Sequence, residues 1–180
     1  MSSSLLPEPK RSRKCEFSTE GQGHANQGTL ILFSLFDGGG VVRKICKTLS
    51  IRPTAVVAAE TESTLRSAVA SEYGYTAKNF GWTTDNDKTP ALYLHNVWDL
   101  FAKKDGVPAH ALQQALSFAD KAQHRYLIIG GSPCTDLTSA CTHGGLLGFA
   151  GKESYHYHVF PFLISAIQAL DPLAQIFVIF

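Results

Sequence analysis

The sequence lacks a strong bias of charge. Its formal net charge is +1 and charged residues make up 17% of it, so there is no global basic signal for nucleic acid, although a local basic surface stays open. It has no apolar run long enough to span a bilayer, and residues 1–28 contain no apolar region typical of a signal peptide. We therefore expect a soluble intracellular protein in a reducing compartment, where its four cysteines are free thiols.

The composition and residue pattern of the chain change at residue 29. Residues 1–28 are rich in Ser, Gly, Glu, Lys and Arg without periodicity, which predicts a disordered tail. Its basic cluster, Pro9–Lys14, is either a solvated stretch, which we favour, or a targeting signal or DNA contact. Residues 29–180 are long enough for one domain. We predict strands at 29–36, 54–60, 91–95, 126–130 and 174–180, and helices at 41–49, 61–74, 108–121 and 154–170.

The predicted strands are continuous apolar runs, and helices separate them. This pattern predicts an α/β fold, a doubly wound and mostly parallel sheet with helices on both faces. On the first helix, Val42, Ile45, Cys46 and Leu49 share one face. The chain stops at Phe180, inside its most apolar strand, where a terminal carboxylate would be costly to bury. We therefore expect the sheet to be truncated after its fifth strand.

Ligands of doubly wound folds bind beyond the carboxyl ends of the strands. The glycine-rich turn Asp37–Gly40 follows the first strand there, and Glu60 ends the second. The turn is neither a GxGxxG fingerprint nor a phosphate-binding loop, and a glycine cluster by itself is more often a tight turn without a ligand. Glu60 either accepts the hydroxyls of a ribose or interacts with a helix dipole. Together the two features favour a nucleoside-containing cofactor.

Cys134 follows the fourth strand in a loop-like setting, within SPCTDLTS. A lone cysteine is often a small buried hydrophobe, but these polar and glycine neighbours favour an accessible, reactive thiol. A zinc site is the less favoured alternative, because the spacing matches no common finger or ribbon. Its candidate ligands would be Cys134, Cys141, His143, His156 and His158, of which the last two more plausibly line a helix start.

Three runs in this order and spacing, LFSLFDGGG, AAE and IIGGSPCTDLT, resemble the cytosine-5 DNA methyltransferases. The SPCxDL variant is most similar to the de novo-type branch, since most of the family has Pro-Pro-Cys-Gln. The resemblance covers roughly residues 29–180. It implies a Rossmann-like S-adenosylmethionine-dependent methyltransferase fold, with residues 29–180 as an incomplete catalytic domain. It also implies double-stranded DNA as the partner, and a nuclear protein if eukaryotic or a cytoplasmic one if bacterial or phage.

The resemblance also assigns roles by position. Cys134 falls on the catalytic nucleophile, Glu60 on the residue that binds the ribose hydroxyls, and 135–152 on the mobile loop that closes over DNA. Asn96 stands where the family often has Asp, next to the adenine, and its amide oxygen can still accept from the adenine amino group. No metal is implied. The residues assigned to the cofactor are Phe36, Asp37, Gly38, Gly40, Glu60, Asn96, Val97 and Pro133.

The chemistry suits these residue types. Attack of a thiolate on C6 turns cytosine into an enamine whose C5 can take a methyl group, and the base must first be flipped out of the duplex. The family's next motif, Glu-Asn-Val, would follow Phe180, so we expect this segment alone to bind cofactor poorly and not to methylate DNA. Two alternatives stay open, a catalytically inactive regulatory module with the same fold and a tRNA cytosine-5 methyltransferase.

Overall fold

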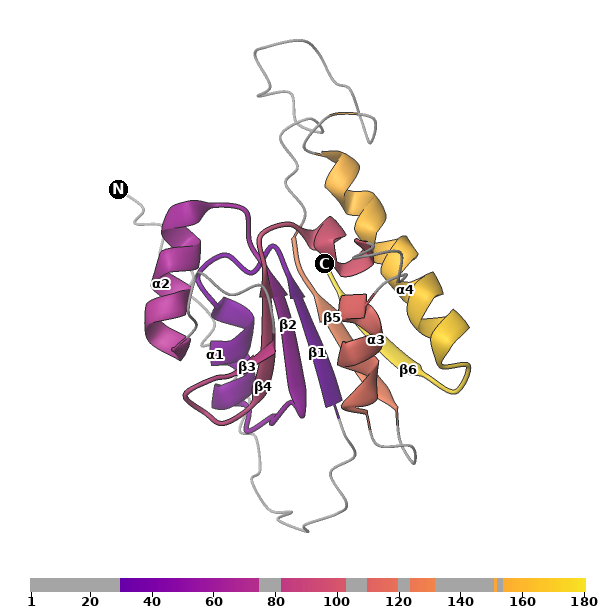
Figure 1. Cartoon of the computed structure of the whole chain (residues 1–180), viewed down its shortest axis with the longest axis horizontal. Helices are drawn as coiled ribbons and strands as arrows, with labels where there is room; N and C mark the ends of the chain where they lie inside the picture. The colour runs from indigo at the N-terminus through magenta and orange to yellow at the C-terminus, as the bar shows by residue number, and fades with distance from the viewer. Residues whose placement is uncertain (1–29, 75–81, 103–109, 120–123, 132–150, 152–153) are drawn as a thin grey trace, which may run out of the picture.

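The computed structural model describes residues 30–74, 82–102, 110–119, 124–131, 151 and 154–180. They form a six-stranded sheet in the order β3-β4-β2-β1-β5-β6, drawn in Figure 1. All neighbouring strands run parallel except β3, which is antiparallel to β4. The strands are β1 Leu30–Leu35, β2 Ala55–Ala59, β3 Trp82–Thr84, β4 Pro90–Leu94, β5 Arg125–Ile129 and β6 Gln175–Ile179.

Helices cover both faces of this sheet. One layer holds α1 Val41–Thr48 and α2 Ser63–Tyr73, and the other holds α3 His110–Ser117 and α4 Val159–Leu170 (Figure 1). Two 3₁₀ helices, η1 Val97–Phe101 and η4 Ser154–His158, belong to the second layer. The prediction of a mostly parallel α/β sheet covered on both faces is therefore confirmed for the described residues.

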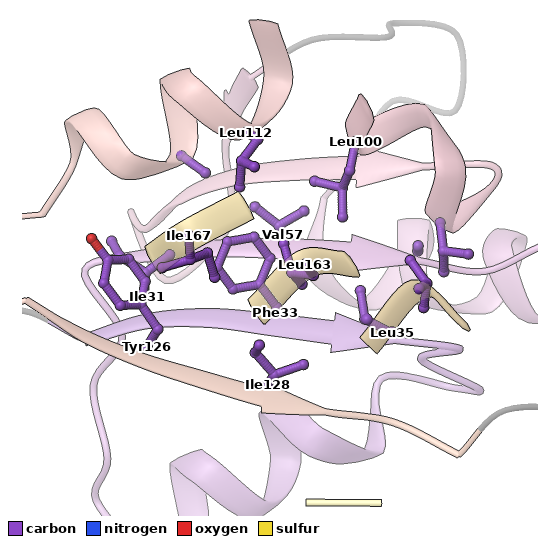
Figure 2. Packing of buried hydrophobic residues seen from close by; sticks show 14 of the residues in the cluster. Ile31, Phe33, Leu35, Val57, Leu100, Leu112, Tyr126, Ile128, Leu163 and Ile167 are labelled. Carbon is purple, nitrogen blue, oxygen red and sulfur yellow. The ribbon is translucent and has the colours of Figure 1, made fainter. Parts of the chain in front are cut away.

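The larger core lies between the sheet and the α3–α4 layer. Phe33 of β1 pairs in register with Val57 of β2 and Ile128 of β5, and all three are fully buried or nearly so. Figure 2 shows Leu163 and Ile167 of α4 packed over these side chains. Continuous burial of β1 and β2 explains why both strands are apolar at every position but Ser34.

The strand order reverses beside β1. From β1 the chain proceeds to β2 and then β4 on one side, whereas β5 and β6 lie on the other. Such a switch point opens a crevice at the carboxyl ends of the two central strands, here β1 and β5. The turns that follow β1 and β5 therefore border the same crevice.

Several local predictions need correction. β3 was not predicted, so the run 174–180 is the sixth strand of the sheet and not the fifth. The segment predicted as one helix from Ser154 is divided into η4 and α4, with Pro161 in the first turn of α4, where a missing amide donor is harmless. The helix predicted at 61–74 is α2, which Glu62 caps with its side chain and which Gly74 ends in the left-handed conformation.

The residues predicted to share one face of α1 differ widely in burial. Cys46 is 3% exposed, but Ile45 is 50% and Leu49 63% exposed. Arg43 is buried in their place, since it forms an ion pair with Asp85 and its guanidinium lies 3.9 Å from the centre of the Tyr73 ring. The buried residues of α1 are thus Arg43 and Cys46, and Arg43 pairs with Asp85 from the β3–β4 turn. The predicted tail, residues 1–28, lies outside the described residues.

Candidate functional site

The turn after β1 is built by left-handed backbone. Phe36, Gly38 and Gly40 have φ angles of 56°, 60° and 73°. A Cβ atom on Gly40 would lie 2.7 Å from the Tyr73 ring, so glycine is required there for space as well as conformation. Gly40 is the N-cap of α1, and no side chain among the described residues caps the helix. Amide groups of the first turn of α1 are therefore left for another acceptor.

Glu60 fastens this turn to the end of β2. Its Oε2 accepts from the amide of Gly38 at 2.8 Å, and its Oε1 accepts from the amide of Glu62 at 2.8 Å. A backbone hydrogen bond of 2.9 Å also joins the two segments, donated by the amide of Asp37 to the carbonyl of Ala59. Each carboxylate oxygen has a further lone pair, so Glu60 can hold both turns and still accept from a ligand hydroxyl. The residue is 8% exposed.

Asp37 is turned away from the crevice. Ser34 donates to its Oδ1, and Ser34 occupies the β1 position between Phe33 and Leu35, whose side chains enter the opposite layer. The other oxygen, Oδ2, is buried without a partner among the described residues. Burial raises the pKa of Asp37, opposed by the Ser34 hydrogen bond and the charge of Arg43. The geometry therefore gives Asp37 a place beneath the turn, against the α1–α2 layer.

Asn96 and Val97 follow β4 at the same edge. The amide of Glu60 donates to the carbonyl of Leu94 at 3.2 Å, which joins the ends of β2 and β4. Asn96 caps η1: its Oδ1 accepts from the amide of Trp98 at 3.0 Å, and Asp99 accepts from the amide of Asn96. The Asn96 oxygen that is expected to face an adenine amino group thus already accepts one hydrogen bond, and one of its two lone pairs is left. Val97 is 2% exposed and belongs to the core, so little of its side chain can reach a ligand.

An aromatic wall from η4 and α4 borders the turn, and no pattern in the sequence had indicated it. Phe36 lies with its ring centre 5.9 Å from that of His156 and 6.2 Å from that of Phe160. The indole nitrogen of Trp98 donates to Nδ1 of His156 at 3.2 Å, which links η1 to η4. His156 and His158 lie in η4, at the start of the helical segment, as the favoured interpretation predicted. Rings at this spacing pack against one another, so Phe36, His156 and Phe160 form one aromatic cluster beside the turn.

No group of three or more potential metal ligands occurs within the described ranges. The other zinc candidates, Cys134, Cys141 and His143, lie outside those ranges, as does Pro133. The zinc site and the roles given to Cys134 and Pro133 are therefore still predictions.

Gly130 directly follows β5 and comes four residues before Cys134, and its contacts fix where β5 ends. Its amide donates to the carbonyl of Ile179 at 3.1 Å, and a Cβ atom on it would lie 2.0 Å from the carbonyl oxygen of Leu35. β5 therefore ends against the last residue of β1, immediately before the glycine-rich turn. Gly131, three residues before Cys134 in the sequence, is exposed at this same edge.

No protein family model matches the chain, and no curated protein matches its sequence. The described residues contain no helix that is both long and apolar enough to cross a membrane.

Proposed function

We propose that the chain carries the S-adenosylmethionine-binding half of a DNA cytosine-5 methyltransferase catalytic domain. The observation that supports this best is the bond between the Gly38 amide and Glu60, because it sets a left-handed glycine turn and a ribose-type acceptor side by side. The motif resemblance, which includes SPCTDLT after β5, supplies the reaction.

The described residues fit a nucleoside sulfonium. Uncapped amides at the start of α1 suit a carboxylate, and Glu60 suits ribose hydroxyls. Phe36 offers a ring beside the turn. Asn96 retains one lone pair for an amino group. One carboxylate oxygen of Asp37 accepts from Ser34 beneath the turn, so the assignment of Asp37 to the cofactor rests on the resemblance alone. When bound, S-adenosylmethionine would supply an electrophilic methyl group.

Cys134 carries the covalent step. Its thiolate adds to C6 of a flipped cytosine, and the electron pair of the C5–C6 bond becomes the enamine that makes C5 nucleophilic. After C5 is methylated, loss of the C5 proton expels the cysteine and restores the aromatic ring. The thiol must be ionised first, since a free cysteine has a pKa of about 8.5.

Trapping on a duplex that contains 5-fluorocytosine tests this function. The fluorine cannot leave as a proton does, so the adduct with Cys134 accumulates and survives a denaturing gel. The experiment uses the natural full-length protein. Cys134→Ser should abolish the adduct, and Cys46→Ser should leave it intact.

The alternatives give different results. Binding of S-adenosylmethionine with no adduct on either DNA or RNA would favour an inactive regulatory module. An adduct with 5-fluorocytosine tRNA and none with duplex DNA would favour the tRNA enzyme. An adduct that persists in Cys134→Ser would remove the role given to Cys134.

A further inference from the structure

A hollow lies near the amino ends of the strands, whereas the candidate site lies at their carboxyl ends. The hollow has a volume of about 400 Å³ and is bounded by α1, by the Ser50–Pro53 connection that leads into β2, and by the β3–β4 turn. These segments precede β2 and β4, whereas the glycine turn and Glu60 follow strands (Figure 1). The hollow therefore shares no residue with the crevice described above.

Its walls are held together before any ligand arrives. The buried ion pair between Arg43 and Asp85 joins α1 to the β3–β4 turn. Within that turn, the amide of Thr89 donates to Asp85 at 2.8 Å. On the other side, the amide of Ile51 donates to the carbonyl of Cys46 at 2.8 Å, which fixes the Ser50–Pro53 connection against the end of α1. A preformed hollow loses little entropy when it is filled.

The rim of the hollow is cationic and its floor is apolar. Arg43, Lys47 and Arg52 line it with a single carboxylate, Asp87. Lys47 meets Asp87 at 3.6 Å with both side chains largely in solvent, so this pair is weak and easily exchanged. Arg52 makes no ion pair within the described part of the chain. The floor is formed by Cys46, Ile51, Pro53 and Val56.

Two hydroxyl groups complete the lining. Ser50, from the connection that leads into β2, and Thr89, from the β3–β4 turn, line the hollow, and a hydroxyl group can donate to an anionic oxygen. Arg and Lys with hydroxyl donors are the usual partners of phosphate and carboxylate groups. An apolar floor of this size suits the body of a small organic molecule rather than an inorganic ion.

We infer that this hollow binds a small organic anion, with its phosphate or carboxylate between Lys47 and Arg52 and its apolar body on the floor. The site is independent of methyl transfer, so it can stand even if the proposed function fails. The anion displaces the exposed Asp87 from Lys47 and leaves the buried Arg43–Asp85 pair in place.

Phenyl phosphate, titrated into the isotopically labelled full chain, tests the inference by NMR. The backbone amide signals of Lys47 and Ser50–Arg52 should shift in a saturable manner. Arg52→Gln should weaken the binding of phenyl phosphate about tenfold, as loss of one charged hydrogen-bond partner predicts. The matched control is Lys44→Gln, which removes an exposed cation of the same helix that does not line the hollow. Arg52 is exposed, and an unchanged spectrum of the free variant verifies its fold.

Further probes separate the two halves of the ligand. Benzoate should bind in the same place if carboxylates are accepted, whereas benzyl alcohol and inorganic phosphate should each bind at least tenfold more weakly. The inference is overturned if benzyl alcohol or inorganic phosphate binds as well as phenyl phosphate, or if Lys44→Gln weakens binding as much as Arg52→Gln. Shifts confined to Asp37–Gly40 would overturn it too, because the anion would then sit at the start of α1.

Discussion

The carboxylate of Glu60 accepts a hydrogen bond of 2.8 Å from the amide of Gly38, across the ends of two parallel strands. It accepts another of 2.8 Å from the amide of Glu62. One carboxylate therefore fastens the turn after β1 and the start of α2 while it faces the proposed cofactor crevice. Positioning and ligand binding depend on the same group. Its substitution should affect both stability and affinity.

Glu60→Ala should weaken S-adenosylmethionine binding at least tenfold and lower the free energy of unfolding by about 2 kcal/mol, because two amides lose a charged acceptor. Titration calorimetry and urea unfolding measure the two effects. Glu72→Ala is the control, since Glu72 pairs with Lys44 on the exposed surface of α2 and should change neither quantity. Unchanged affinity in Glu60→Ala would remove the ribose role from Glu60.

Two adjacent glycines after β5 should respond very differently to alanine. A Cβ atom at Gly130 would meet the carbonyl oxygen of Leu35 at 2.0 Å, whereas one at Gly131 would meet nothing within 4 Å. Because backbone cannot yield as a side chain can, Gly130→Ala should lower the free energy of unfolding by about 3 kcal/mol. Gly131→Ala should stay within about 0.5 kcal/mol of the wild type. Equal losses in urea unfolding would show that β5 does not end against β1.

The sequence predicted those parts of the fold in which consecutive residues, or residues at a regular spacing, are buried. β1 and β2 are buried on both faces and read as unbroken apolar runs. Strand order then brings the glycine turn, Glu60 and Asn96 to one edge, and the hydrogen bonds between strand ends show them there. Their roles toward a cofactor are still predictions.

The parts that were missed depend on distant partners. β3 has three residues and, among the described strands, pairs only with β4, so its sequence carries no periodic pattern. The burial of Arg43 requires Asp85, which lies 42 residues away. His156 reaches the site through Trp98, 58 residues before it. No local pattern of residues could have predicted these contacts.

The buried ion pair of Arg43 should matter far more than its exposed neighbour. Asp85→Asn leaves the Arg43 charge buried without its partner, and we expect a loss of about 3 kcal/mol in the free energy of unfolding. Asp87→Asn is the same chemical change two residues later, at an exposed pair with Lys47, and should cost less than about 0.5 kcal/mol. Comparable urea midpoints for the two variants would contradict a buried pair.

Asp37 should make stability depend on pH in the direction opposite to that of a salt-bridged carboxylate. Burial raises its pKa in the folded state, while the unfolded chain keeps the ordinary value near ~3.9. Between these two values the folded protein binds more protons than the unfolded one. Stability from this group is therefore full below the unfolded pKa and is lost as pH rises through the folded pKa.

Asp37→Asn removes this titration and leaves the other carboxylates unchanged. The stability of the variant relative to the wild type should be highest near pH ~7 and should fall as the pH is lowered toward ~4, because only the wild type then gains from protonation. Urea unfolding of both proteins across this range measures the difference, with Asp87→Asn as an exposed control whose difference should not follow this trend. A variant that instead improves relative to the wild type on acidification would mean that Arg43 and the start of α1 hold Asp37 as a stabilised anion.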